Sequence, residues 1–187
     1  LLDKYNVKVT FFVTNTHPDY QNLIAEEAKR GHTVAIHSAS HKYNQIYTSE
    51  QAFFDDLEQM NSIIKAQTGN DASIIRFPGG SSNTVSKDYC PGIMTQLVND
   101  VTARGLLYCD WNVSSGDANS KPISTEQVVQ NVISGVQSHN VSVVLQHDIK
   151  DFSVNAVEQI IQWGQANGYT FLPLTTSSPM SHHRINN

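Results

Sequence analysis

The sequence TVAIHSASH, residues 33–41, joins a short apolar run to two histidines four positions apart. Residues 33–36 are typical of a buried strand, and His37 follows at once. Two neutral imidazoles that converge form half of a zinc-type metal site. A helical turn, or a looser turn at a strand end, would bring His37 and His41 to one opening. Taken alone, the pair could equally be two polar histidines in a solvated loop.

Strand-like and helix-like segments alternate along the rest of the chain. We expect strands at residues 7–13, 32–36, 73–75, 106–109, 141–146 and 169–172. We expect helices at residues 19–30, 49–68, 91–104 and 154–167, and one that starts at the capping box 124–127. Residues 1–5 should be the last turn of a further helix. Strict alternation of this kind predicts an α/β fold with a parallel sheet and helices outside it.

Composition limits the class of protein. The 187 residues, 39% of them hydrophobic, are enough for a single domain with its own core, residues 1–187, ending in a polar tail at 175–187. The net charge of −5 and the absence of any Lys/Arg cluster argue against nucleic acid as a partner. No apolar run approaches the roughly 18 to 20 residues that cross a bilayer.

The chain starts with Leu1 rather than Met, so we expect the gene product to start earlier, with room for a signal or anchor upstream. Low charge and loops rich in Ser, Asn and Thr favour an extracellular or cell-surface protein. Cys90 and Cys109 could be a disulfide or two buried thiols, and this setting favours the disulfide.

Every unusual polar cluster begins within a residue or two of a predicted strand end. The histidine pair follows the second strand. The other clusters are RFPGG at residues 76–80, DWNVSSGD at 110–117 and HD at 147–148. In a parallel α/β barrel the loops at the carboxyl ends of the strands meet on one rim. We therefore expect these four loops to converge there.

The second cluster combines a fixed charge with a flexible turn. Arg76 has a forked guanidinium suited to a bidentate grip on a carboxylate, although a surface Arg with a solvent ion pair would have the same sequence. Pro78 fixes a turn, and Gly79 lets backbone approach a ligand and offers its N–H to a developing oxyanion. A plain surface turn is the alternative.

The last two clusters offer an acid–base pair. Asp117 beside His147 would hold the imidazole in the orientation that general-acid chemistry needs. Their contact is inferred from position alone. Trp111 and Leu145 accompany them and could be ordinary core residues.

The motifs HSASH (37–41), RFPGG (76–80), WNVSSGD (111–117) and LQH (145–147), in this order, resemble motifs two to five of the polysaccharide deacetylases, carbohydrate esterase family four. The likeness is strongest to the bacterial peptidoglycan N-acetylglucosamine deacetylases. It implies a distorted (β/α)7 barrel of parallel strands and a divalent metal, Zn²⁺ above all, held by His37 and His41. The implied substrate is a glycan, peptidoglycan or a chitooligosaccharide, from which N-acetyl groups are hydrolysed.

The resemblance also implies a role for each remaining site residue. His147 would be the general acid, Asp117 would tune the acidity of its imidazole, and Arg76 would orient the catalytic base. Trp111 and Leu145 would be walls of the acetyl pocket.

One part of the family pattern is missing. The first motif, a Thr-Phe-Asp-Asp-Gly run that ends the first strand, supplies both the catalytic base and an Asp metal ligand, and this chain begins after the point where it should stand. We therefore expect the first strand to be absent and these 187 residues alone to be nearly inactive. Ala118 also stands where many relatives have an aromatic residue. Two alternatives stay open: a non-catalytic glycan-binding or cell-wall protein on the same fold, and an acetylxylan esterase.

Overall fold

The computed structural model describes residues 1–119, 121 and 123–186. The chain divides into two compact units, each described here by itself. Unit 1 consists of Leu1–Val7 and Trp111–Leu172, and unit 2 consists of Lys8–Asp110 and Pro173–Asn187. Among the described residues, no helix combines the length and the apolar character needed to cross a membrane.

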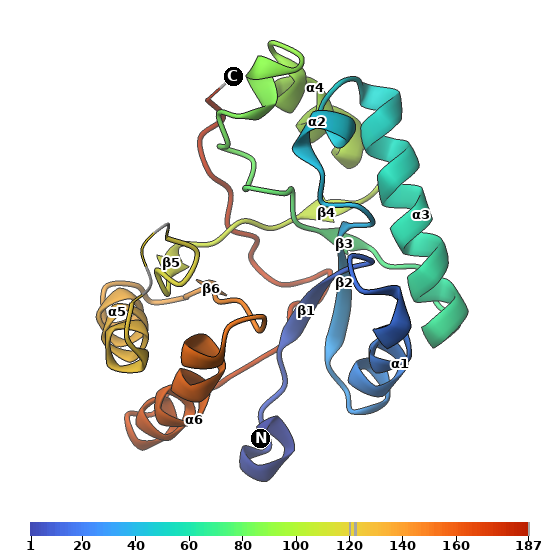
Figure 1. The fold of residues 1–187 in the computed structure, drawn as a ribbon. Helices are drawn as coiled ribbons and strands as arrows, with labels where there is room; N and C mark the ends of the chain where they lie inside the picture. The colour runs from blue at the N-terminus through green and yellow to red at the C-terminus, as the bar shows by residue number, and fades with distance from the viewer. Residues whose placement is uncertain (120, 122, 187) are drawn as a thin grey trace. The chain divides into compact units, whose positions relative to one another are not determined.

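Unit 2 contains a parallel four-stranded sheet in the order β1-β2-β3-β4 (Figure 1). Its strands are β1 (Thr10–Thr14), β2 (Thr33–Ser38), β3 (Ile74–Ile75) and β4 (Leu107–Tyr108). Its helices are α1 (Asn22–Lys29), α2 (Tyr43–Ile46), α3 (Glu50–Thr68) and α4 (Ile93–Ala103), with short 3₁₀ helices at Pro18–Tyr20 and Ser86–Asp88. Consecutive strands are neighbours in this sheet, so each helical segment between them is a crossover connection.

Helix α3 shows how local sequence fixes an element. The Ser49 hydroxyl accepts a hydrogen bond from the Ala52 N–H at 3.1 Å and caps the first turn. Gly69 ends the helix with a φ of 81°, in the left-handed region. Between these caps, apolar residues at helical spacing are buried: Phe53, Phe54, Leu57, Met60 and Ile64. The helix was predicted to be capped by Thr48 or Ser49 and to end before Gly69, and the structure selects Ser49 as the cap and confirms the end.

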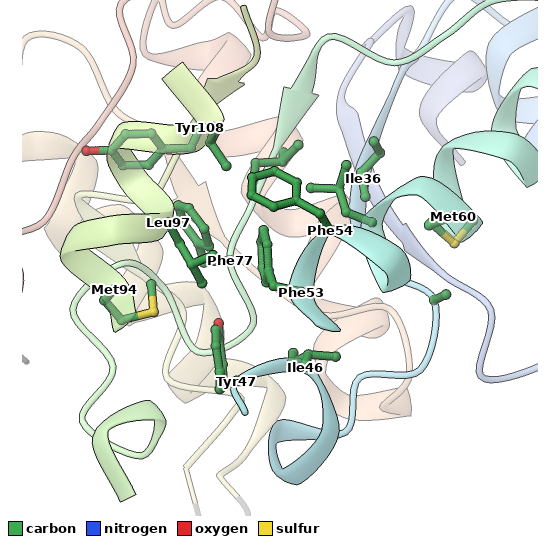
Figure 2. Packing of buried hydrophobic residues seen from close by; sticks show 14 of the residues in the cluster. Ile36, Ile46, Tyr47, Phe53, Phe54, Met60, Phe77, Met94, Leu97 and Tyr108 are labelled. Atoms are coloured by element: carbon green, nitrogen blue, oxygen red, sulfur yellow. The ribbon is translucent and has the colours of Figure 1, made fainter. Parts of the chain in front are cut away.

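The core of unit 2 is rich in aromatic rings (Figure 2). Phe53 lies between Tyr47, stacked at 6.1 Å between ring centroids, and Phe77 at 5.4 Å, and Phe77 continues to Tyr108 at 5.5 Å. This row of rings joins α3 to the loop after β3 and to strand β4. It gives the loops at the carboxyl ends of these strands a rigid base.

The polar tail is held against unit 2. The Asp110 N–H donates to the Ser181 carbonyl at 2.7 Å, and the His183 N–H donates to the Asp110 carboxylate at 2.9 Å. The His182 ring stacks on Tyr108 with 4.0 Å between centroids. These contacts anchor residues 181–183 at the end of β4.

Unit 1 pairs two short parallel strands, β5 (Val113–Ser114) and β6 (Val144–Leu145), with helices α5 (Thr125–Gln137) and α6 (Asp151–Ala166) (Figure 1). A 3₁₀ helix at Leu2–Tyr5 also belongs to this unit. The Ser124 hydroxyl accepts from the Gln127 N–H at 3.2 Å, as the predicted capping box requires. Apolar faces of the two helices form a second core: Val128, Val129, Val132, Ala156 and Ile160.

The α/β class with parallel strands is confirmed, although the described strands do not close into a barrel. The strand predicted at residues 169–172 is wrong. Phe171 packs so tightly on α6 that a Cβ at Gly164 would lie 2.6 Å from its ring, and the Tyr169 N–H donates to the Gly164 carbonyl at 2.9 Å. Side-chain packing on the helix, rather than strand pairing, therefore holds this segment.

Other differences are local. Leu2–Tyr5 form a 3₁₀ helix rather than the α-helical end predicted at residues 1–5, and the helix predicted at 19–30 is divided into Pro18–Tyr20 and α1. Helix α2 and strand β5 were not predicted, because four and two residues are too few for a periodic pattern. The expected disulfide is also absent: Cys90 and Cys109 are both free thiols, Cys109 being fully buried.

Candidate active site

Two imidazoles face each other at the carboxyl end of β2. His37 is the penultimate residue of this strand, which runs two residues further than predicted, and His41 lies in the following loop with a φ of 55°. The Nε2 atoms of His37 and His41 are 3.2 Å apart, and their ring centroids are 4.9 Å apart. The i,i+4 spacing thus brings both rings together through a left-handed turn rather than through a helix.

The geometry of the pair fits two ligands of a zinc ion. Two nitrogens about 2.05 Å from zinc at a tetrahedral angle would lie roughly 3.3 Å apart, close to the observed 3.2 Å. His37 Nδ1 lies 2.8 Å from the Arg76 carbonyl oxygen. That carbonyl can only accept, so Nδ1 carries the proton and the lone pair belongs to Nε2, the tautomer that binds metal. Within the described residues, no His, Cys, Asp and Glu side chains gather in a group of three or more, so the fit is to a half-site.

Asp56 of α3 organises the loop that carries these histidines. Its carboxylate accepts from the Ser38 hydroxyl at 2.6 Å, the Ala39 N–H at 2.9 Å and the Ser40 N–H at 2.8 Å. The Ser38 hydroxyl in turn accepts from the His41 N–H at 2.9 Å. One half-buried carboxylate therefore fixes the backbone between the two imidazoles.

Asp56 was missed by the sequence analysis, although a signal was present. It lies at position i+3 from Phe53 and one residue before Leu57, on the buried face of α3. A charged residue on an apolar helical face usually has a buried partner.

Arg76 is buried at the end of β3 and binds backbone. Its Nε donates to the Cys109 carbonyl at 2.8 Å, and one terminal nitrogen donates to the Asp110 carbonyl at 2.9 Å. The guanidinium also lies over the Phe12 ring, 4.0 Å from its centroid. Burial lowers the pKa of Arg76. Its predicted grip on a carboxylate base stays a prediction.

The loop after Arg76 holds a tight turn. Gly79 and Gly80 have φ values of 77° and 79°, in the left-handed region that favours glycine. The Gly80 N–H donates to the Phe77 carbonyl at 2.8 Å, and the buried Tyr47 hydroxyl donates to the Pro78 carbonyl at 2.7 Å. Gly79 itself is exposed, and its N–H has no acceptor among the described residues.

Asp110 secures the far side of this loop and was not predicted as a site residue. Its carboxylate accepts from the Ser81 N–H at 2.8 Å and from the Ser81 hydroxyl at 2.5 Å. Asp110 is fully buried two residues after the end of β4. A carboxylate directly after a predicted strand was the available signal.

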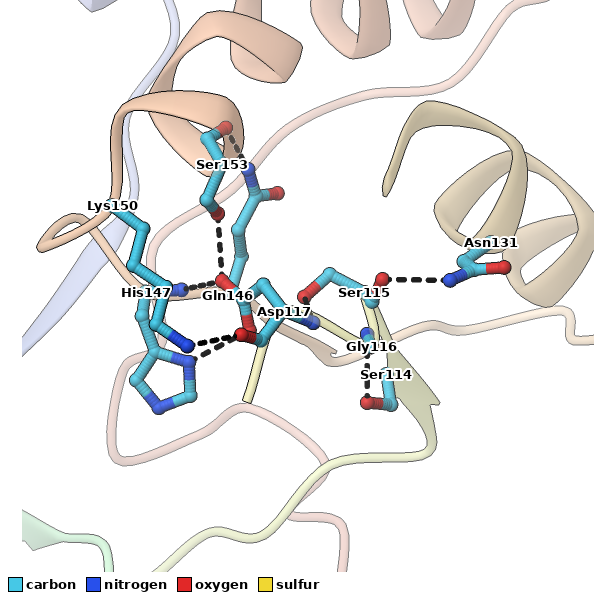
Figure 3. Close-up of polar contacts among 9 residues, drawn as sticks. All are labelled: Ser114, Ser115, Gly116, Asp117, Asn131, Gln146, His147, Lys150 and Ser153. Atoms are coloured by element: carbon cyan, nitrogen blue, oxygen red, sulfur yellow. Dashed lines mark hydrogen bonds and ion pairs between the residues drawn. The ribbon is translucent and has the colours of Figure 1, made fainter. Parts of the chain in front are cut away.

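In unit 1, Asp117 and His147 form the carboxylate–imidazole pair that the sequence predicted (Figure 3). His147 Nδ1 lies 2.8 Å from one Asp117 oxygen, and the His147 N–H donates to the other at 2.6 Å. The Ser153 hydroxyl donates to this second oxygen at 2.6 Å. The Asp117 side chain is 1% exposed, whereas the His147 side chain is 37% exposed, so the pair presents its imidazole to solvent.

The electrostatics of Asp117 favour the ionised form. Burial alone would raise the pKa of this carboxyl. The hydrogen bonds from His147 and Ser153 outweigh burial and hold the Asp117 pKa well below its usual range. An ionised carboxylate accepts the proton of His147 Nδ1, which leaves Nε2 as the ring atom that exchanges protons with a substrate.

Two further residues complete this network. Lys150 Nζ donates to the Asp117 carbonyl, and Gln146 Nε2 donates to the Ser153 carbonyl at 2.7 Å (Figure 3). Sequence reasoning missed Ser153, which lies on the buried face of α6 in line with Ala156 and Ile160.

Trp111, the first residue of the second segment of unit 1, and Leu145 in β6 are half-buried. Their predicted role as pocket walls stays a prediction. The structure thus brings together His37, His41, Arg76 and Gly79 within unit 2, and Asp117 with His147 within unit 1.

A parallel α/β protein with a zinc-type histidine pair at one strand end and a carboxylate–imidazole pair at another has the parts of a hydrolase. The polysaccharide deacetylase family model matches residues 1–90. The crystal structure of the catalytic domain of peptidoglycan N-acetylglucosamine deacetylase from Eubacterium rectale is 97% identical, with a TM-score of 0.99 over all of this chain and 84% of that one. The chain belongs to the polysaccharide deacetylase family.

Two curated proteins are more distant relatives. A peptidoglycan-N-acetylglucosamine deacetylase of Bacillus cereus is 28% identical over 91% of this chain and 60% of its own length. A bifunctional xylanase/deacetylase of Pseudobutyrivibrio xylanivorans is 28% identical over 94% of this chain and 27% of its own length. The chain therefore spans less than two thirds of either relative.

Proposed function

We propose that this protein is a metal-dependent hydrolase that removes acetyl groups from N-acetylglucosamine units of a glycan, of the peptidoglycan or chitin type. The observation that carries the proposal is the facing histidine pair, with its nitrogens at zinc-ligand spacing and its tautomer set by the Arg76 carbonyl. Membership of a deacetylase family supports the reaction class.

His37 and His41 would hold the metal, with Zn²⁺ as the ion that two imidazole nitrogens at this spacing suit. When bound, such an ion acidifies water and polarises the acetyl carbonyl. The chain's own contribution is to orient both rings through Asp56 and the Arg76 carbonyl.

The other residues have roles that their contacts suit. The exposed Gly79 N–H donates to the acetyl oxygen as negative charge develops on it. His147, oriented by Asp117, carries a proton at Nε2 and delivers it to the amine that leaves. Trp111 and Leu145 would enclose the acetyl methyl group, and Arg76 would orient a catalytic base. A cell-wall glycan lies outside the membrane, so we place the protein at the cell surface or in the extracellular space.

Acetate release and zinc titration test these assignments. We expect acetate from N-acetylglucosamine oligomers or peptidoglycan when zinc is supplied, and none after chelation. His37→Ala should abolish both acetate release and calorimetric zinc binding. His147→Ala should abolish acetate release alone. His139→Ala, which alters an exposed histidine bonded to the Gly135 carbonyl, should change neither. Equal zinc affinity in wild type and His37→Ala would rule out the metal site.

A second function has one observation in its favour. The described residues supply two zinc ligands and no group of three, which is consistent with a non-catalytic glycan-binding protein on the same fold. We also expect these 187 residues alone to release acetate slowly. Loss of a single acid–base group typically lowers a rate about a hundred-fold or more. A side-by-side assay with the 97% identical E. rectale catalytic domain, of which this chain covers 84%, decides. Comparable turnover by the two proteins would show that a complete set of catalytic groups lies within the 187 residues. Absence of activity in the E. rectale catalytic domain as well would favour the binding function.

Acetylated xylan belongs in the same assay. The same chemistry would serve O-acetyl groups, and one relative is named a bifunctional xylanase/deacetylase. Faster release from xylan than from N-acetylglucosamine oligomers would redirect the proposal from amide to ester hydrolysis.

A further inference from the structure

We infer that the Tyr43 hydroxyl is a substrate-contacting group that donates a second hydrogen bond, beside the Gly79 N–H, to the oxygen of the acetyl group. The inference rests on the proposed function and adds a residue to it. It concerns unit 2 alone, where Tyr43 begins helix α2 two residues after His41.

The backbone at Gly79 makes room for this hydroxyl. A Cβ built on Gly79 would lie 2.7 Å from the Tyr43 hydroxyl oxygen and 3.2 Å from its ring carbon Cε1. Contacts under 3.0 Å do not occur for real Cβ atoms, so any side chain at position 79 would have to displace Tyr43 or be displaced by it. Gly79 therefore allows Tyr43 to stand directly against the exposed turn that carries the proposed oxyanion donor.

The Tyr43 ring is fixed by its neighbours. The Tyr43 ring contacts the His41 ring, with 5.7 Å between centroids and an interplanar angle of 78°. It also contacts the Tyr47 ring, with 5.6 Å between centroids and an angle of 65°. The ring also packs on the hydrophobic core of unit 2. A ring held on two sides directs its hydroxyl to one place, beside Gly79.

The hydroxyl itself has no hydrogen-bond partner in the described part of the chain. Neighbouring Tyr47, by contrast, donates its hydroxyl to the Pro78 carbonyl at 2.7 Å. Tyr43 is half-buried, and a hydroxyl in such a place normally finds a partner. A ligand oxygen beside Gly79 would supply it.

Two donors suit the chemistry of the acetyl oxygen. When the carbonyl carbon becomes tetrahedral, its oxygen gains negative charge and can accept more than one hydrogen bond. The Gly79 N–H and the Tyr43 O–H would both point to it, and Tyr43 would keep its proton throughout. Removing one donor of this kind typically lowers turnover about a hundred-fold to a thousand-fold.

The test is Tyr43→Phe in the protein as its gene encodes it, since this change removes the hydroxyl and keeps the ring. We expect kcat on N-acetylglucosamine oligomers to fall about a hundred-fold with a smaller change in KM. The melting temperature and the calorimetric zinc affinity should not change. Tyr20→Phe, at a ring that is 64% exposed, is the matched control and should leave all four quantities unchanged.

A double-mutant cycle with Gly79→Ala examines whether the two groups act as one pocket. The new methyl group must push on the Tyr43 hydroxyl, so Gly79→Ala should already lose most of the activity. Adding Tyr43→Phe to that variant should then cost less than about three-fold, because contacting residues act non-additively. Independent, multiplicative losses would overturn the shared pocket.

The outcomes separate this inference from the function on which it rests. If wild type and Tyr43→Phe release acetate equally well, the role of Tyr43 is overturned and the deacetylase proposal still stands. If Tyr43→Phe also binds zinc more weakly or has a lower melting temperature, Tyr43 has a structural role, and the inference is overturned as well. Wild type that releases no acetate with any supplied metal would refute the deacetylase function, and the inference would fail with it.

Discussion

Replacing Asp117 by Asn should destabilise unit 1 far more than its isosteric shape implies. The carboxylate accepts three hydrogen bonds, from the His147 ring, the His147 N–H and the Ser153 hydroxyl. An Asn side chain can keep its oxygen toward the last two. Its NH₂ group then faces His147 Nδ1 donor to donor, unless the imidazole changes tautomer and protonates Nε2.

The magnitude follows from this count. A hydrogen bond to a charged group contributes about 1.5–3 kcal/mol, against about 1 kcal/mol for a neutral one. One bond is lost and two fall to neutral strength. The bond to the His147 ring is counted at the low end, because that side chain is 37% exposed and solvent screens it. We expect a loss of about 2.5–5.5 kcal/mol at pH 7, which at a typical slope of about 2 kcal/mol/M lowers the urea midpoint by about 1–3 M.

Both tryptophans of the chain, Trp111 and Trp163, belong to unit 1, so their fluorescence during urea unfolding reports on this unit. Asp148→Asn makes the same charge change at an exposed neighbour and is the control. An Asp117→Asn midpoint equal to that of Asp148→Asn would refute the reasoning.

The effect should also depend on pH. The Asp117 pKa is lowered in the folded protein, so its contribution is fully present above the unfolded value of about 3.9 and is lost as the pH falls through the lower folded value. The part of the stability difference between wild type and Asp117→Asn that comes from the ionised carboxylate should shrink below about pH 4. A difference that grew in acid would contradict the sign of this shift.

Two further predictions concern unit 2. Asp56→Asn should weaken zinc binding about ten-fold or more, because it loosens the loop between the two histidines. Asp55→Asn, at the exposed neighbouring position, should leave zinc binding unchanged. Equal calorimetric zinc affinities of the two variants would argue against this positioning role of Asp56. In the native protein, Cys90 should be alkylated faster than Cys109, whose thiol is buried and whose pKa burial raises; a non-reducing mass spectrum lacking two free thiols would contradict the structure.

Sequence predicted those elements whose signals are local. Helices α3 and α5 were placed because Ser49 and Ser124 cap them and apolar residues recur at helical spacing between their ends. The two-residue strands were predicted too long, by one residue at β3, two at β4 and four at β6, since β-branched runs continue beyond the residues that pair. The segment at 169–172 failed because its β-branched and aromatic pattern serves equally well for packing on a helix.

Site residues followed the same division. The contact between Asp117 and His147 was predicted, from the motifs that contain them and their positions after strand ends. Asp56, Asp110 and Tyr43 were not, because each acts through a partner far away in sequence or in a loop whose backbone conformation no local pattern specifies. The left-handed turn at His41 is an example.

Arg76 explains why the residues of unit 2 form one rigid group. Its own carbonyl sets the tautomer of His37 near the end of β2, and its guanidinium binds the carbonyls of Cys109 and Asp110, which follow β4. The carboxylate of Asp110, one of those two residues, then holds Ser81 and so the loop that contains Gly79. A buried guanidinium is tolerated only where carbonyls satisfy it, and these carbonyls lie at fixed strand ends. The metal half-site and the proposed oxyanion donor are therefore both positioned through one residue, Arg76, whose backbone carbonyl binds His37 and whose guanidinium binds the backbone just after β4.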